Sequence, residues 1–525
     1  MSAPVAGNVP NTDPSSAMDD RKFFGHPRGL GLLFTTEMWE RFSYYGMRAI
    51  LVLFLTQSLH WSTRDAATLY GNYTALVYLT PLIGGYLADR WLGTRRSLVI
   101  GGVIIAAGHF CLAFSSMTMF YVGLALVIIG TGFFKPNVST MVGQLYRPGD
   151  ARRDAGFTLF YMGINLGATL GQFVCGWFGD PVRYGETGWH IGFAAAGVGM
   201  VAGLIVYMWG RDIFLPGIGL GTAAKRAKDA LGGAAAAAAA AADSRAVLHG
   251  TIGAAVGGAL AWYLGGPSPL GLAFGLLIGA TLTITVLGSQ GEERKQVFAI
   301  FIVVFFAAAF WACYEQAGSS MNLFAANNTQ LFVGSFHIPP AWLQSVNSIC
   351  ILIFGPVFAA LWLFLIKRGK EPSTAMKMVL GLTLLGVGFL FMVLGGRRAD
   401  TGMLVSPLWL TAAYAFHTFG ELCLSPVGLS YVTKVAPVKF ASLLMGVWFL
   451  SNAAANKIAG WFAAFTPTPG QAPEAPMTGF GGYIQHVSAT NEGFFSIFVV
   501  VAFGAAAAML LCVPLLKRLT ANVQA

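Results

Sequence analysis

A charged face inside an apolar segment is the part of this sequence best equipped for chemistry. Residues 35–48 read TTEMWERFSYYGMR, and at offsets of 0, 3, 4, 7, 8 and 11 they place Glu37, Glu40, Arg41, Tyr44, Tyr45 and Arg48. At 3.6 residues per turn these side chains share one face of a helix. A charge near the centre of a bilayer costs about 2.5 to 3.5 kcal/mol on insertion scales, so surviving charges pair or face water. We therefore expect this face to line an aqueous functional site.

The alternative for this face is a locked salt bridge that only helps two helices assemble. Glu37 and Arg41 stand at i and i+4 with the acid first, which is the favoured direction for a helical ion pair. A silent pair needs two charges, whereas this helix carries four. The excess favours a functional role for this face.

Further charges lie in other apolar segments. Lys135 in GTGFFKPNVS corresponds in position to Glu421 in FGELCLSP, and Arg41 corresponds to Glu315 in FWACYEQAGSS. The cations therefore belong to the first half of the chain and the anions to the second. A cavity between such halves has one positive and one negative wall, which suits a zwitterionic ligand.

Polar and aromatic residues accompany these charges and are candidate ligand contacts. They are Tyr78, Asn165, Trp311, Gln344, Asn347, Ser425 and Trp448. Apolar walls accept many shapes, while a few polar groups fix the orientation of a ligand. For any single aromatic residue, packing or interfacial anchoring is the alternative, and only the cluster favours a binding site.

The composition indicates that the segments carrying these residues lie in a membrane. Of the 525 residues, 56% are hydrophobic and 10% are charged, against about a quarter charged in soluble proteins. The hydrophilic start lacks the pattern of a cleavable signal peptide. The six cysteines lie singly in or beside apolar segments and are interpreted as packing residues. No metal-ligand spacing is present, so we expect no metal and no cofactor.

Fourteen apolar stretches have about the length that a helix needs to cross a bilayer. They lie at 29–55, 66–88, 97–115, 118–145, 156–178, 190–210, 246–264, 270–288, 296–325, 341–366, 376–395, 405–432, 441–465 and 493–516. An even number places both termini on one side, and the excess of lysine and arginine in the loops of that side makes it cytoplasmic. The net charge of +10 is thus explained mostly by basic residues in the cytoplasmic loops, and nucleic-acid binding is not expected. We predict a multi-pass protein of the cell inner membrane.

The spans are not evenly distributed. An Ala-rich stretch from residue 225 to 242 precedes two short, Gly-rich spans, which together look like an insertion; the stretch is either a helix or a flexible tether. Without the insertion, six spans precede the gap and six follow, as in the major facilitator architecture. The predicted fold class is an all-α membrane protein with two six-helix bundles plus two inserted helices. The predicted regions are 1–28 (cytoplasmic segment), 29–212 (first bundle), 213–292 (linker and insertion) and 293–525 (second bundle).

Several motifs resemble the proton-dependent oligopeptide transporters, the POT family of the major facilitator superfamily, in its bacterial form. They are EMWERFSYYG, GGYLADRWLGTRR, GTGFFKPNVS, FYMGINLGA, FWACYEQAGSS, GELCLSPVGLSYVTKVAP and MGVWFLSNAAANKIAG, which run from residue 37 to about 460. The resemblance implies uptake of dipeptides and tripeptides driven by inward proton flow. One departure is that animal members carry a histidine in the second span, where this chain has approximately Gly71. Proton coupling is therefore expected to rest on carboxylates.

The resemblance also implies roles for individual residues. Glu37, Glu40 and Arg41 would couple protons, with Glu315 facing them, and Asp89 and Arg90 belong to a general facilitator gating signature. The peptide carboxylate would point toward Arg48 and Lys135, and its amine toward Glu421. Further peptide contacts implied in this way are Tyr44, Tyr45, Asn165, Ser425 and Trp448, while Tyr78, Gln344 and Asn347 match in local context only.

The predicted mechanism is a competition for Arg41. Ionised Glu37 or Glu40 attracts Arg41 within its own helix, whereas Glu315 attracts it across the gap, and protonation removes one competitor. A facilitator for another solute, such as nitrate, is the nearest alternative, although Glu421 suits a bare anion poorly. A membrane enzyme is disfavoured because no nucleophile with its base, metal cluster or phosphate loop is readable. A sensor or scaffold would not need charges at the membrane midplane.

Overall fold

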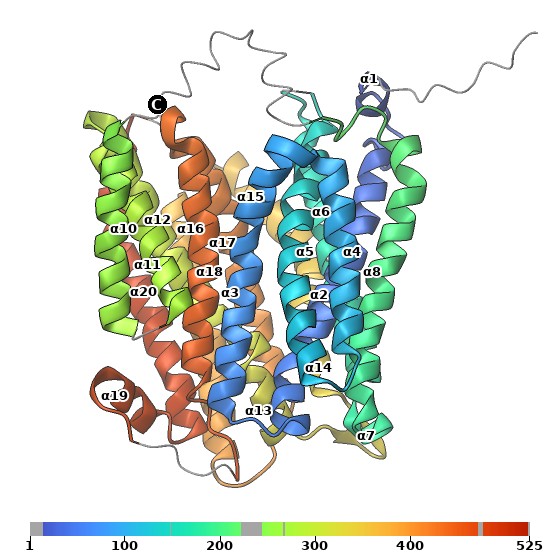
Figure 1. The fold of residues 1–525 in the computed structure, drawn as a ribbon. Coiled ribbons are helices and arrows are strands. Elements are labelled where there is room, and N and C mark those ends of the chain that lie inside the picture. Colours follow the sequence, from blue (N-terminus) through green and yellow to red (C-terminus); the bar gives the residue numbers. More distant parts are fainter. Residues whose placement is uncertain (1–13, 148, 222–243, 266–267, 471–475, 523–525) are drawn as a thin grey trace, which may run out of the picture. The chain divides into compact units, whose positions relative to one another are not determined.

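The computed structural model describes residues 14–147, 149–221, 244–265, 268–470 and 476–522, and almost all of its regular structure is helical (Figure 1). The Ala-rich stretch at 225–242 and the first thirteen residues of the predicted cytoplasmic segment lie outside the described residues.

Long helices occupy all fourteen ranges predicted to cross the membrane. They are α2 (Arg28–Leu53), α3 (Thr63–Leu87), α4 (Thr94–Leu112), α5 (Met117–Gln144), α6 (Arg152–Phe178), α8 (Thr187–Phe214), α10 (Ser244–Gly265), α11 (Pro269–Leu287), α12 (Gly291–Tyr314), α15 (Ser345–Lys367), α16 (Thr374–Ala399), α17 (Leu408–Val435), α18 (Ala441–Ala463) and α20 (Asn491–Leu519). Among the described residues, nine segments are apolar and long enough to cross a membrane by those criteria alone. Helix α2 falls outside that set because Glu37, Glu40 and Arg41 interrupt its apolar sequence. The predicted all-helical membrane fold is confirmed.

Short elements join these helices. The helical ones are α1 (Ser15–Met18), α7 (Pro181–Tyr184), α13 (Ser320–Asn328), α14 (Pro340–Leu343), α19 (Gly479–Val487), the π-helical turns η1 (Phe54–Ser58) and η2 (Ala88–Leu92), and the 3₁₀ turns η3 (Glu315–Gly318) and η4 (Val438–Phe440). Strands β1 (Phe332–Val333) and β2 (Phe336–His337) form an antiparallel hairpin. Gly334, with φ of 61°, supplies the positive φ that its two-residue turn requires.

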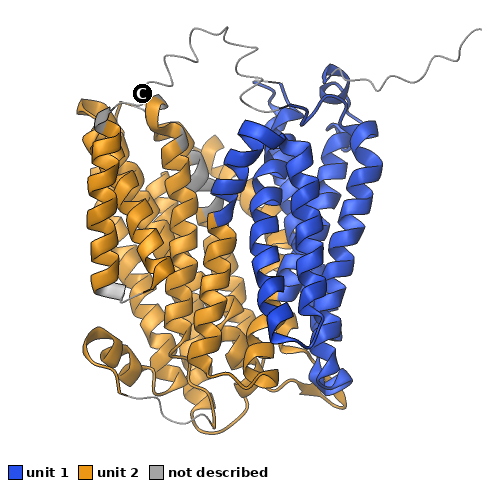
Figure 2. Cartoon of the chain, in the orientation of Figure 1, with its two compact units in different colours: residues 1–47, 80–232 blue, residues 48–79, 233–525 orange. Residues whose placement is uncertain are grey.

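The chain divides into two compact units, drawn in different colours in Figure 2. Unit 1 comprises residues 1–47 and 80–232, and unit 2 comprises residues 48–79 and 233–525. The boundaries fall inside α2 and α3, so unit 2 contains the later part of α2 and the earlier part of α3. The predicted regions 29–212, 213–292 and 293–525 follow the order of spans along the chain, and they remain a prediction.

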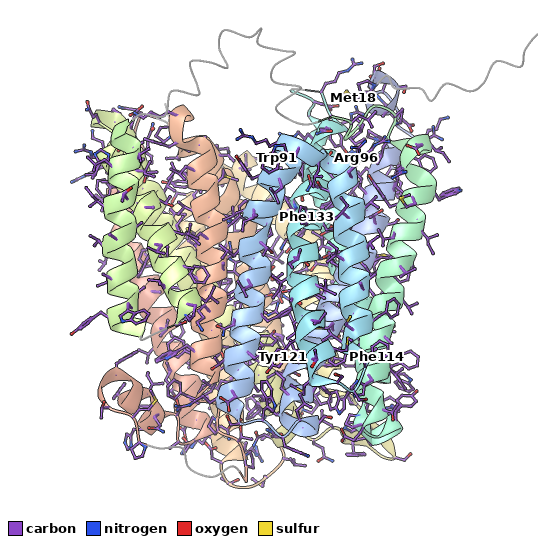
Figure 3. All side chains as sticks on the ribbon, in the orientation of Figure 1. Met18, Trp91, Arg96, Phe114, Tyr121 and Phe133 are labelled. Carbon is purple, nitrogen blue, oxygen red and sulfur yellow. The ribbon has the colours of Figure 1, made fainter. Side chains whose placement is uncertain are left out.

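Glycines allow helices α4 and α5 of unit 1 to pack closely. A Cβ atom added to Gly101 would lie 2.6 Å from the carbonyl oxygen of Gly130, and one added to Gly123 would lie 2.8 Å from that of Gly108. Small residues of this kind let membrane helices approach backbone to backbone. Phe114, just after the end of α4, and Tyr121, near the start of α5, are exposed at one end of this helix pair (Figure 3). Exposed apolar side chains are expected where lipid is the solvent.

Helix α6 supports the charged helix α2 in the same unit. A Cβ at Gly167 would collide with the carbonyl oxygen of Met38, and one at Gly171 would collide with that of Phe42. The backbone of α2 therefore rests directly on α6 along this side. This contact fixes the part of α2 from which Glu37, Glu40 and Arg41 project.

Unit 2 contains a break in the predicted span 296–325. Helix α12 ends at Tyr314, the 3₁₀ turn η3 covers Glu315–Gly318, and α13 starts at Ser320. The backbone at Ser319 has φ of −125° and ψ of −92°, which is not helical. Interrupted membrane helices are tolerated where neighbouring protein or a water-lined cavity satisfies the backbone. The break places Tyr314 and Glu315 at the end of a helix rather than in its middle.

Candidate functional site

The first polar cluster lies in unit 1 and is centred on Arg41 in α2. The Arg41 Nη2 atom donates to Glu40 Oε1 at 2.6 Å, and Arg41 Nε also pairs with Glu40 Oε2. The same Nε lies 3.3 Å from Glu37 Oε1. All three side chains are buried, with Arg41 only 2% exposed. Arg41 therefore donates two parallel hydrogen bonds to Glu40 and makes a single, longer contact with Glu37.

The two carboxylates of this cluster differ in how well they are satisfied. Within the described part of the chain, Glu37 Oε2 is buried and has no hydrogen-bond partner. The charge of Lys135 in α5 also acts on Glu37. The predicted attraction of Arg41 to Glu37 and Glu40 within the helix is present, and the pairing with Glu40 is the tighter of the two.

Other predicted residues of unit 1 surround this cluster or lie further away. The Arg41 guanidinium carbon lies 5.0 Å from the ring centre of Tyr44 and 5.8 Å from that of Tyr45, within the range of cation–π attraction. Asn165 donates through Nδ2 to the carbonyl oxygen of Tyr161 in its own helix.

The predicted gating residues Asp89 and Arg90 lie in the turn η2, and both are exposed. Arg90 Nη1 donates to the hydroxyl of Tyr86 at 2.7 Å. The structure describes no salt bridge for Asp89 within residues 14–147 or the other described ranges. Their gating role stays a prediction.

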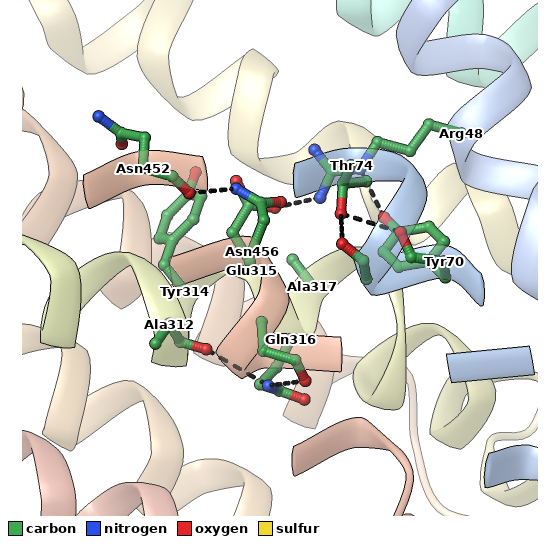
Figure 4. Close-up of polar contacts among 12 residues, drawn as sticks. Arg48, Tyr70, Thr74, Ala312, Tyr314, Glu315, Gln316, Ala317, Asn452 and Asn456 are labelled. Atoms are coloured by element: carbon green, nitrogen blue, oxygen red, sulfur yellow. Dashed lines mark hydrogen bonds and ion pairs between the residues drawn. The ribbon is translucent and has the colours of Figure 1, made fainter. Parts of the chain in front are cut away.

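The second polar cluster lies in unit 2, where Arg48 pairs with Glu315 (Figure 4). Arg48 Nε also donates to the hydroxyl of Tyr70 at 2.5 Å. The sequence led us to expect Arg41 as the cation attracted by Glu315, and the ion pair described for Glu315 is instead made by Arg48. Arg48 belongs to the same compact unit as Glu315, whereas Arg41 belongs to the other unit.

A third group of hydrogen bonds converges on Glu421 in α17 of the same unit. Tyr314 donates its hydroxyl to Glu421 Oε2 at 2.5 Å, and Asn347 Nδ2 donates to the same oxygen at 3.0 Å. Asn347 Nδ2 also donates to Thr418 Oγ1 at 2.9 Å. Glu421 is buried, with 7% of its surface exposed. The predicted residues Asn347 and Glu421 are thus brought into direct contact.

The remaining predicted residues of unit 2 have other surroundings. Tyr78 packs against a small apolar cluster that contains Phe274 of the inserted helix α11. The indole of Trp311 packs edge-on against Tyr314, with ring centres 5.1 Å apart. Gln344 Nε2 donates weakly to the carbonyl oxygen of Ala49 at 3.4 Å.

Trp448 is nearly buried in the core of unit 2, where its backbone carbonyl accepts from the side chains of Ser451 and Asn452. Ser425 lies in α17, and its side chain falls outside the described part of the structure.

Three residues of these networks were missed by sequence reasoning: Tyr70, Tyr314 and Thr418. Thr418 stands three residues before Glu421, a spacing that places both on one helix face, so it could have been found. Tyr314 directly precedes Glu315 in a motif already singled out, but adjacency alone gives no direction for its side chain. Nothing in the sequence around Tyr70 indicates a partner for Arg48.

Solved structures share this arrangement of helices. A crystal structure of the peptide transporter POT in complex with sulfate matches with a TM-score of 0.76 and 36% identity, over 97% of this chain and 99% of that one. A POT family transporter in complex with 5-aminolevulinic acid matches with a TM-score of 0.77 and 30% identity, over 96% of this chain and 100% of that one. The fold and the buried charges of the membrane helices together define a transporter of the major facilitator type.

Sequence comparisons define the family within that class. The sequence model of the POT family matches residues 95–477. The uncharacterized transporter YclF of Bacillus subtilis is 39% identical, over 86% of this chain and 90% of that protein. The peptide transporter YePEPT of Yersinia enterocolitica is 35% identical over 84% and 88%, and the di-/tripeptide transporter of Lactococcus lactis subsp. cremoris is 36% identical over 84% and 89%. The chain belongs to the POT family.

Proposed function

We propose that this protein is a proton-coupled symporter that imports dipeptides and tripeptides by alternating access. Support comes from the POT family membership and from relatives named as peptide and di-/tripeptide transporters. The observation that carries the proposal is the Glu421 cluster, in which a carboxylate buried in a membrane helix is held by the side chains of Tyr314 and Asn347. A buried anion that is oriented in this way can receive the ammonium group of a peptide.

The peptide carboxylate is assigned to Arg48 and Lys135. Because Arg48 is paired with Glu315, a peptide carboxylate has to compete with Glu315 for the guanidinium. Protonation of Glu315 removes that competitor and makes Arg48 available. This replaces the competition for Arg41 that the sequence suggested for Glu315. Further peptide contacts that we propose are Tyr44, Tyr45, Tyr78, Asn165, Trp311, Gln344, Asn347, Ser425 and Trp448.

The carboxylates of α2 are assigned to proton coupling. Glu40 holds Arg41 with two hydrogen bonds, whereas Glu37 makes one longer contact and has a buried oxygen without a hydrogen-bond partner in the described residues. A buried, unsatisfied charged oxygen is costly, and a proton on Glu37 would remove its charge while leaving the Glu40–Arg41 pair intact. Of the two carboxylates of α2, we therefore propose Glu37 as the one that takes up a proton.

The proposed topology has both termini in the cytoplasm and the protein in the cell inner membrane. The basic residues clustered near the loops of one side support this orientation through the positive-inside rule. Within this topology we propose a six-plus-six organisation, with 29–212 and 293–525 as the two bundles and 213–292 as linker and inserted pair. We propose no enzymatic activity and no cofactor.

Uptake of labelled dialanine by purified protein in liposomes tests the proposal. We expect accumulation with an inward proton gradient and only equilibration without it. Unlabelled dialanine should compete, whereas nitrate should not. Folded protein that transports none of several dipeptides under a proton gradient would overturn the proposal and favour another solute.

A further inference from the structure

We propose that Gln316 is a positioning residue for the Arg48–Glu315 pair. Its side chain fixes the 3₁₀ turn η3 to α18, and this anchor sets how strongly Glu315 holds the guanidinium that a peptide carboxylate has to take over. The inference deepens the proposed peptide transport and rests on it. Gln316 directly follows Glu315 in the motif FWACYEQAGSS, and no role was expected for it.

The side-chain amide of Gln316 is buried and forms hydrogen bonds at both ends. Its Nε2 atom donates to the carbonyl oxygen of Ala459 in α18 at 3.0 Å and, over a longer 3.3 Å, to that of Ala312 in α12 (Figure 4). Its Oε1 atom accepts from Ser320 Oγ in α13 at 2.6 Å. An amide nitrogen carries two hydrogens, so both are used. One side chain therefore joins α12, α13 and α18 at the point where the membrane helix is broken.

The turn benefits from such an anchor because the α-helical ladder stops before it. Helix α12 ends one residue before Glu315, and the backbone of Ser319 is not helical. A 3₁₀ segment has poorer hydrogen-bond geometry than an α-helix. The Tyr414 hydroxyl also holds this turn, by donating to the carbonyl oxygen of Ala317 at 3.2 Å. The bond from Gln316 to α18 is the shorter of these two tertiary bonds, and it comes from the residue next to Glu315.

The turn meets the ion pair at both of its ends, so its position controls the geometry of the pair. At the first residue of the turn, Glu315 Oε2 pairs with Arg48 Nη2. At the last residue, a Cβ atom added to Gly318 would collide with the Tyr70 hydroxyl and lie 3.0 Å from Arg48 Nη2. The Tyr70 hydroxyl itself accepts from Arg48 Nε. A shift of the turn therefore changes both the carboxylate contact and the space that the guanidinium occupies.

Helix α18 is a suitable anchor, because it touches α3 backbone to backbone. A Cβ atom added to Gly460, next to the acceptor of the Gln316 bond, would lie 2.6 Å from the Cα atom of Gly71. Gly71 follows Tyr70, whose hydroxyl binds Arg48. The contacts therefore run in a closed ring from η3 to α18, to α3, to the guanidinium and back to η3. Gln316 provides a hydrogen bond between η3 and α18 in this ring, so its loss should let the turn withdraw from the guanidinium.

A looser turn should favour the peptide. In the proposed function, a peptide carboxylate competes with Glu315 for Arg48. Each bond that keeps Glu315 in place makes this exchange less favourable, so removing the Gln316 amide should strengthen peptide binding. An effect that acts through Glu315 disappears once the charge of Glu315 is gone, and a double-mutant cycle measures such coupling.

Binding of dialanine to the purified protein, measured by titration calorimetry at neutral pH, tests this role. In Gln316→Leu, we expect the Kd for dialanine to fall by about threefold to tenfold, the equivalent of one hydrogen bond. In a Glu315→Gln background, the same substitution should change the Kd by less than about twofold. Thr383→Val is the control, because it removes a hydrogen bond from a side chain of α16 to the carbonyl oxygen of Val379. It should leave the Kd unchanged in both backgrounds.

A change in Kd that is equal in the two backgrounds would indicate a merely structural effect and overturn the inference, as would an unchanged or higher Kd in Gln316→Leu. If Gln316→Leu does not fold, Ser320→Ala removes the donor to Gln316 Oε1 and keeps the amide. A fall in the Kd of about twofold or more, absent in the Glu315→Gln background, then supports the inference, and any other result refutes it. Dialanine uptake by the unmodified protein upholds the proposed function in either case, and its absence overturns both.

Discussion

The unequal hold of Glu37 and Glu40 on Arg41 predicts that two chemically identical substitutions will have different effects on stability. Glu40→Gln removes the partner that binds Arg41 through two nitrogen–oxygen pairs, one of them at 2.6 Å. Glu37→Gln removes a single contact of 3.3 Å between Glu37 Oε1 and Arg41 Nε. Both substitutions are nearly isosteric, so the difference in stability between the two variants reflects the loss of each negative charge and not a change in side-chain shape.

The magnitudes follow from burial. Removing one partner of a buried ion pair costs about 3–5 kcal/mol, because the other charge is left uncompensated. The residual contact with Glu37 should keep the cost of Glu40→Gln near the lower end of that range. For Glu37→Gln we expect about 1 kcal/mol, the size of one modest polar contact, since the Glu40–Arg41 pair survives and the repulsion between two neighbouring carboxylates is relieved. The two variants should differ by about 2 kcal/mol in their free energy of unfolding.

Unfolding of the purified variants in mixed micelles, followed by tryptophan fluorescence, measures this difference. Asp154→Asn, at an exposed carboxylate near the start of α6, is the control and should match the unmodified protein. In liposomes, Glu37→Gln should lose proton-driven accumulation of dialanine yet retain exchange of labelled for unlabelled peptide. A cost for Glu37→Gln equal to or greater than that for Glu40→Gln would refute the reasoning, and full proton-driven accumulation by Glu37→Gln would exclude it as the coupling residue.

Three further predictions concern parts of unit 1 outside the charged cluster. The pKa of His26 is lowered from 6.5, first by burial and then by the nearby Arg152, so the unfolded chain binds the proton more readily than the folded protein. The stability that neutral His26 contributes should therefore be present above pH 6.5 and be lost as the pH falls below it. His26→Gln should reduce the loss in unfolding temperature between pH 7.5 and pH 5.5. Gly101→Ala should destabilise by about 1–3 kcal/mol because its Cβ would meet the backbone of α5, whereas Gly446→Ala, with no neighbouring atom within 4 Å, should be neutral in the same unfolding assay. Arg95→Gln should cost about 1–2 kcal/mol, because Arg95 Nη2 donates to the carbonyl oxygens of Arg211 and Leu215 at the end of α8. Arg96→Gln, at an exposed position, should cost little, and equal effects of the two substitutions would contradict this capping role.

The span pattern was predictable because length and apolarity are local properties of the chain. All fourteen predicted ranges carry long helices, since a backbone in hydrocarbon has to satisfy its own hydrogen bonds. The break after Tyr314 was not predicted, because 296–325 was interpreted as a single span, although the polar residues EQAGSS at 315–320 interrupt its apolar sequence. The backbone there is stabilised by tertiary contacts such as the one from Gln316 Nε2 to the carbonyl oxygen of Ala459 at 3.0 Å.

For the candidate site, the sequence by itself determined which residues carry charge within the membrane helices and that Glu37, Glu40 and Arg41 share a helix face. The tertiary structure decided the pairing: Glu40 rather than Glu37 as the main partner of Arg41, Arg48 for Glu315, and Tyr314 and Asn347 for Glu421. The physical reason is that a helix repeat fixes the direction of a side chain only along its own helix. Which donor meets which acceptor on different helices depends on distances between segments that are 74 to 267 residues apart in the chain, and the packing of helices sets those distances.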